Sequence, residues 1–142
     1  MSRVRDIVRV GEFFAVEGHQ SVAEVARIMA DLHVGAILVI DGEELRGVFS
    51  ERDLMHRVVL QHRDPDQACV REVMTTEVAT IDELASIEEA MEAMRTHHCR
   101  HLPVIRQGHV VGFLSMRDLM NHELARTTDE LHHMLAYIGS SA

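Results

Sequence analysis

Two spacings of apolar residues alternate along the chain and predict its helices and strands. Residues 22–32 and 87–94 carry apolar side chains three and four positions apart, which is typical of a helix that buries one face. A short run rich in β-branched residues follows each of them, which favours a buried strand and then a hairpin. The predicted hairpin strands are 36–40 with 45–49 and 102–105 with 110–114. Shorter strands at 12–16 and 77–81, and second helices beginning at Glu51 and Met116, complete two β-α-β-β-α units of an α/β fold.

The two units are copies of one sequence. Shifting the chain by 65 residues from Ser21 to Met55 aligns the halves without a gap and gives 12 identities in 35 positions. The clearest match is segment 47–55, which returns as 112–120, while the opening 4–8 matches 70–74 at an offset of 66. The duplication predicts two intertwined halves related by a pseudo-two-fold axis, with any site present twice.

The duplication also sets the expected boundaries along the chain. They are repeat 1 at 1–62, a polar connector at 63–69, repeat 2 at 70–125 and a C-terminal helical extension at 126–142. An apolar stripe from Leu119 to Ile138 continues beyond the second repeat. This stripe either folds back on its own core or forms a contact between two copies, and we expect a homodimer. Thr127 and Thr128 offer a second N-cap, at which the helix would break.

Composition excludes several classes of function. The formal net charge of −9 argues against nucleic-acid binding, which needs a basic face. The sequence has no apolar run of about 18 residues and no apolar signal core, so we expect a cytoplasmic protein without a membrane partner. The segment 97–101 contains His and Cys, but neighbouring side chains diverge, so we expect no metal site. No nucleophile–base pair indicates catalysis, so we expect no enzyme and no required cofactor.

The repeated S-x-R-D motif is the strongest candidate for binding chemistry. Ser50 and Asp53, and again Ser115 and Asp118, lie at a predicted strand-to-helix junction, where free N–H groups and the helix dipole favour an anion. An acid one turn into the helix can accept hydrogen bonds from a vicinal diol such as ribose. The same spacing also fits an ordinary capping box, which needs no arginine. Both roles can coexist on the same residues.

Together these features resemble the CBS-domain pair, or Bateman module, in its stand-alone bacterial form. The resemblance rests on the β-α-β-β-α duplication, the opening 74–78, the strand 100–105 and the paired G-h-h-S-x-R-D-L segments, and it covers residues 4 to 125. It implies a regulatory module without catalytic activity that senses an adenine nucleotide (AMP, ADP or ATP) in clefts between the repeats, and acts on an unidentified protein. The alternative is a ligand-free scaffold that acts through its dimer surface.

The resemblance also implies which residues contact the nucleotide. The two aspartates would hold the ribose, the serines and arginines of the motif would approach phosphate, the residues that begin the middle strand would line the opposite wall, and the opening strand would meet adenine. The implied ligand-binding residues are Gly35, Ala36, Ser50, Arg52, Asp53, Thr76, Arg100, His101, Ser115, Arg117 and Asp118, with Gly11 as the counterpart of Thr76. Because Arg100 and His101 replace Gly35 and Ala36, we expect the two sites to differ in affinity.

Overall fold

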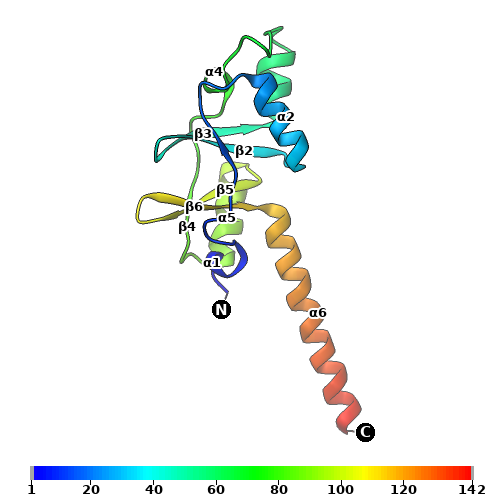
Figure 1. Cartoon of the computed structure of the whole chain (residues 1–142). Helices are drawn as coiled ribbons and strands as arrows, with labels where there is room; N and C mark the ends of the chain where they lie inside the picture. The colour runs from blue at the N-terminus through cyan, green and yellow to red at the C-terminus, as the bar shows by residue number, and fades with distance from the viewer. Residues whose placement is uncertain (1, 142) are drawn as a thin grey trace.

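The structure, a computed structural model, describes residues 2–141 and has one three-stranded sheet for each repeat (Figure 1). The elements of the first half are α1 (Val4–Ile7), β1 (Ala15–Val16), α2 (Val22–Leu32), β2 (Ala36–Asp41), β3 (Glu44–Ser50), α3 (Glu51–Asp53) and the π-helix η1 (Leu54–Val59). Those of the second half are α4 (Val70–Val73), β4 (Ile81–Asp82), α5 (Ile87–His97), β5 (His101–Arg106), β6 (His109–Ser115) and α6 (Met116–Ser141). The predicted α/β fold with two β-α-β-β-α repeats is therefore confirmed.

Both sheets have the same topology and register. The short first strand pairs in parallel with the middle strand, and the middle and return strands form an antiparallel hairpin. A register shift between Val39 and Ile40 recurs between Val104 and Ile105. β1 and β4 are shorter than the predicted 12–16 and 77–81. Just before these ranges the chain bonds to the other repeat: the N–H of Gly11 donates to the carbonyl of Val111, and Thr75 exchanges two backbone hydrogen bonds with Val48.

Each repeat gives its opening segment to the other half of the molecule. The N–H of Val4 donates to the carbonyl of Ala85 at 2.9 Å, and Val4 is buried in the second core. In return, the N–H of Val70 donates to the carbonyl of Gln20 at 2.9 Å, and Val70 is buried in the first core. The halves are thus intertwined, and neither repeat completes its core from its own residues.

The repeated glycine of the G-h-h-S segment is explained by this exchange. A Cβ on Gly47 would lie 2.5 Å from the carbonyl oxygen of Thr75 and 2.9 Å from the sulfur of Met74. At Gly112 it would collide with the side chain of Val8. Only glycine allows the opening of the other repeat to cross the return strand at this distance.

The two repeats differ in the helix that begins at the S-x-R-D motif. In the first, three α-helical residues lead into η1, whereas in the second, α6 continues for 26 residues. The expected break at Thr127 and Thr128 is wrong. Their hydroxyls instead donate to the carbonyls of Glu123 and Leu124, four residues back, as in a continuous helix.

The last part of α6 projects away from the body (Figure 1). Leu119 is buried against the second core, but every residue from 124 to 139 is exposed. The alternative in which the stripe folds back on the chain's own core is therefore not met by these residues. Over the described part of the chain, no helix is sufficiently long and apolar to span a membrane.

Candidate functional site

The candidate site occurs twice, where a return strand ends and a helix begins. In the first half, Ala36 lies opposite Ser50 in the hairpin, and the N–H of Glu51 donates to the carbonyl of Gly35 at 3.0 Å. In the second half, His101 lies opposite Ser115, and the N–H of Met116 donates to the carbonyl of Arg100 at 2.8 Å. We call Gly35, Ala36, Ser50, Arg52 and Asp53 the first junction, and Arg100, His101, Ser115, Arg117 and Asp118 the second junction. The structure therefore brings together the predicted motif and middle-strand residues of each copy, whereas Gly11 bonds to Val111 of the other repeat.

Both serines and both aspartates form capping boxes. The N–H groups of Asp53 and Asp118 each donate to the hydroxyl oxygen of their serine at 3.1 Å. In return, the N–H of Ser50 donates to Oδ2 of Asp53 at 3.0 Å, and that of Ser115 donates to Oδ2 of Asp118 at 2.9 Å. The capping role inferred from the S-x-x-D spacing is therefore confirmed, and it leaves the other oxygen of each carboxylate for different contacts.

Thr75 of the opposite repeat and Arg57 of η1 complete the surroundings of Asp53. The hydroxyl of Thr75, at the opening of the second repeat, donates to Oδ1 of Asp53 at 3.0 Å. Nε of Arg57 lies 3.8 Å from the same oxygen, and its Nη1 donates to the carbonyl of Met74 at 2.6 Å. Thr76, which was predicted to face the ligand, is exposed beside this contact.

Sequence reasoning missed both Thr75 and Arg57. The spacing of four residues between Asp53 and Arg57 on a helix was a usable signal for an ion pair. The contact of Thr75 had no such signal, because it joins two repeats over 22 positions of sequence.

The second junction presents more open polar groups. The guanidinium groups of Arg100 and Arg117 are exposed, and across the described residues neither forms a hydrogen bond or an ion pair. The ring of His101 lies 5.3 Å from that of Phe113, at 31°. Burial lowers the pKa of His101, and Arg100 adds to this effect, while Asp118 and Glu51 oppose it. His101 is therefore mainly neutral at pH 7, so it can offer a ligand its ring rather than a positive charge.

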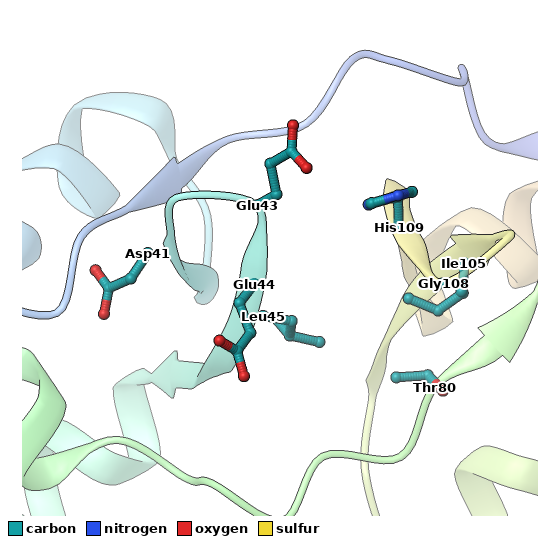
Figure 2. Close-up of a pocket in the computed structure, with 8 residues that line it drawn as sticks. All are labelled: Asp41, Glu43, Glu44, Leu45, Thr80, Ile105, Gly108 and His109. Carbon is teal, nitrogen blue, oxygen red and sulfur yellow. The ribbon is translucent and has the colours of Figure 1, made fainter.

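A separate hollow of about 620 Å³ lies between the tips of the two hairpins (Figure 2). Asp41, Glu43 and Glu44 line one side of it, and Gly108 and His109 line the other. None of the predicted ligand residues borders this hollow. The register places it at the opposite end of the strands from the serines, five residues or about 16 Å away. Its three carboxylates disfavour a phosphate, so the junctions remain the candidate site.

The histidine- and cysteine-containing segment 97–101 forms no cluster. Among the described residues, no group of three His, Cys, Asp or Glu side chains could hold a metal ion. Cys99 is half-buried, and burial raises the pKa of its thiol, which opposes formation of the reactive thiolate.

Comparisons with known proteins agree with the fold and with the duplication. The CBS domain family model matches residues 4–60 and again 70–125. CBS domain-containing protein YhcV of Bacillus subtilis is 34% identical over 125 residues, which are 88% of each chain.

Two solved structures share the arrangement of both repeats. A putative signal-transduction protein with CBS domains from Burkholderia ambifaria is 32% identical, with a TM-score of 0.83 over 87% of this chain and 95% of that one. The CBS domain pair of protein MJ0100, solved with 5′-methylthioadenosine and S-adenosylmethionine, is 20% identical, with a TM-score of 0.76 over 84% of this chain and 98% of that one. With two family matches at the two repeats that the fold displays, this chain belongs to the CBS-domain family as a tandem pair.

Proposed function

We propose that the chain is a regulatory, non-catalytic module that binds an adenosine-containing ligand at the second junction. The observation that carries this proposal is the combination of a partly buried acid, Asp118, with exposed Arg100 and Arg117 at the start of a long helix. The carboxylate suits the ribose hydroxyls, and the guanidinium groups suit phosphate oxygens. The N–H groups of the helix start add a favourable field for an anion.

The ligands of a structural neighbour support the adenosine part of the proposal. The CBS pair of protein MJ0100 was solved with two adenosine derivatives, one of which carries a charged amino-acid moiety instead of phosphate. The arginines of the second junction favour a phosphate, so we propose AMP, ADP or ATP in preference to S-adenosylmethionine. Ligand binding would then change the relative orientation of the repeats and be detected by a regulated protein.

A thermal-shift panel tests this function. The full chain is heated with AMP, ADP, ATP, NAD, S-adenosylmethionine and 5′-methylthioadenosine, with GMP as a matched phosphate control. A ligand at 100 times its Kd stabilises the folded state by about 2.7 kcal/mol, which is readily measured. We expect a shift with AMP, ADP or ATP that GMP does not reproduce. If no adenosine compound gives a shift at millimolar concentration, the sensor function is wrong and the ligand-free scaffold takes its place.

We also propose that the module is a homodimer joined through α6. Leu124, Leu131 and Met134 are 68%, 53% and 62% exposed, although most helical stability in proteins comes from packing of an apolar face. Together with Thr127 and Ile138 they repeat at alternating intervals of three and four residues, the spacing of a two-helix coiled coil.

The apolar stripe of α6 favours a second copy of the same helix as the occupant. When two copies run antiparallel with Leu131 at the centre, Leu124 faces Ile138 of the other copy. Two antiparallel copies of α6 can therefore cover each other's apolar stripe without another partner.

Sedimentation analysis of the full chain tests the dimer. We expect a dimer at micromolar concentration, and a monomer for Leu131→Asp and for a chain that ends at residue 125, where the family match ends. Ala136→Asp is the matched control, because it adds the same charge on the side of the helix away from this stripe. A full chain that sediments as a monomer of 16.1 kDa would contradict the proposal.

A further inference from the structure

The two motif aspartates have identical neighbours in sequence but different contacts in space. Asp53 is 7% exposed. Its Oδ2 accepts the N–H of Ser50 at 3.0 Å and the hydroxyl of Ser50 at 3.1 Å. Its Oδ1 accepts the hydroxyl of Thr75 at 3.0 Å and lies 3.8 Å from Nε of Arg57. A carboxylate has about four acceptor positions, so these three hydrogen bonds leave at most one, beside the Arg57 guanidinium, which is too few for two ribose hydroxyls.

Asp118 keeps most of this capacity. Its Oδ2 accepts the N–H of Ser115 at 2.9 Å, but within residues 2–141 no donor reaches its Oδ1. The hydroxyl of Ser115 accepts the N–H of Asp118 without donating to the carboxylate, unlike the hydroxyl of Ser50. The hydroxyl proton of Ser115 is therefore available to a ligand oxygen.

Two substitutions between the repeats explain the difference. The duplication pairs Thr75 with Arg9 and Arg57 with His122. Arg9 is directed to Glu12, at 3.6 Å, with 83% of its side chain exposed. Nε2 of His122 is buried without a hydrogen-bond partner in the described structure, so it does not take the place of Arg57 at the aspartate.

The charged groups beside the two motif serines also differ, and this difference too favours ligand binding at the second junction. At the first junction the carboxylate of Glu51 lies against Gly35, where a Cβ would be 3.5 Å from it. At the second junction the equivalent positions hold Met116 and Arg100. Glu51 is also within electrostatic range of His101, so its charge reaches the second junction as well. A phosphate would meet an acid first at one junction and a guanidinium group first at the other.

We infer that each chain binds a single adenosine ligand, at the second junction, and that the first junction is a structural latch. In the latch, Asp53 and Arg57 hold Met74 and Thr75 of the second repeat against the helix of the first. The inference rests on the proposed function, since it assigns that function to one of two duplicated sites.

Titration calorimetry on the full chain tests the inference, with AMP, ATP and S-adenosylmethionine as the probes. The duplication supplies matched variants: Asp118→Asn with Asp53→Asn, and Arg117→Ala with Arg52→Ala. We expect one ligand per chain, a loss of affinity of tenfold or more for Asp118→Asn, and a clear loss for Arg117→Ala. Asp53→Asn and Arg52→Ala should keep the wild-type Kd within twofold.

The outcomes separate this inference from the proposed function. Two ligands per chain, or equal losses in the first-junction variants, would overturn the single site while leaving the sensor function in place. Absence of heat with all three probes would overturn both. If Asp53→Asn does not fold, the arginine pair still decides, because both side chains are exposed and tolerate truncation.

Discussion

Replacing Thr75 by Val gives the most direct measure of the contact between the repeats. The change keeps the β-branched shape and the backbone bonds to Val48, and it removes the hydroxyl that donates to Asp53 at 3.0 Å. A hydrogen bond to a charged group contributes about 1.5–3 kcal/mol, and the burial of Asp53 prevents water from replacing it. Because Arg57 still faces the same oxygen, we expect a loss of about 2 kcal/mol.

This loss converts into a measurable melting shift. At about 2.1 cal/mol/K for each residue, unfolding 142 residues has an entropy near 0.3 kcal/mol/K, so 2 kcal/mol corresponds to about 7 °C. Urea unfolding followed by circular dichroism gives the free energy, and calorimetry gives the melting temperature.

The neighbouring residue supplies the control. Thr76 is exposed, and in the described structure its hydroxyl forms no hydrogen bond, so Thr76→Val should stay within about 0.5 kcal/mol of wild type. In an Asp53→Asn background, Thr75→Val should cost clearly less than it does alone, because the charged acceptor is gone. Equal losses for the two threonine variants would refute the latch.

Two further changes test other contacts between distant segments. Arg106 forms a bidentate hydrogen bond with Glu83, at 2.7 Å to each carboxylate oxygen, and this lowers the pKa of Glu83. The ionised Glu83 therefore stabilises the fold above its unfolded pKa of 4.5, and this contribution is lost as the pH falls through its lower folded pKa. Glu83→Gln should therefore be less stable than wild type at pH 7, and urea unfolding from pH 7 to 3 should show the difference shrinking; a constant difference would contradict this. Gly47→Ala should destabilise by about 1–3 kcal/mol or more because its Cβ meets the carbonyl of Thr75, whereas Gly139→Ala, with open space around it, should be neutral or stabilising. Equal effects of the two alanines in thermal unfolding would mean that no close crossing exists at Gly47.

The sequence alone determined the elements and the fold class. Helix 22–32 begins after Ser21 and helix 87–97 after Ser86, and in both the capping serine accepts the N–H three residues on. The hairpins also lie where the apolar runs and turn residues predicted them. These features depend on side chains within a few positions of one another, so the local pattern contains the information. The internal repeat then supplied the pairing of the halves, since one copy cannot bury its own apolar faces.

Only the tertiary structure decided which repeat receives each opening and how the motif is used. Segment 50–55 and segment 115–120 differ at a single position, yet one aspartate is enclosed by Thr75 and Arg57 and the other is partly open. The difference arises from Thr75, which is 22 positions from Asp53 in sequence, and from Arg57, which lies one helical turn beyond Asp53. Hydrogen-bond capacity is a property of all the donors around an oxygen, and chain folding brings those donors together from segments that no local pattern connects.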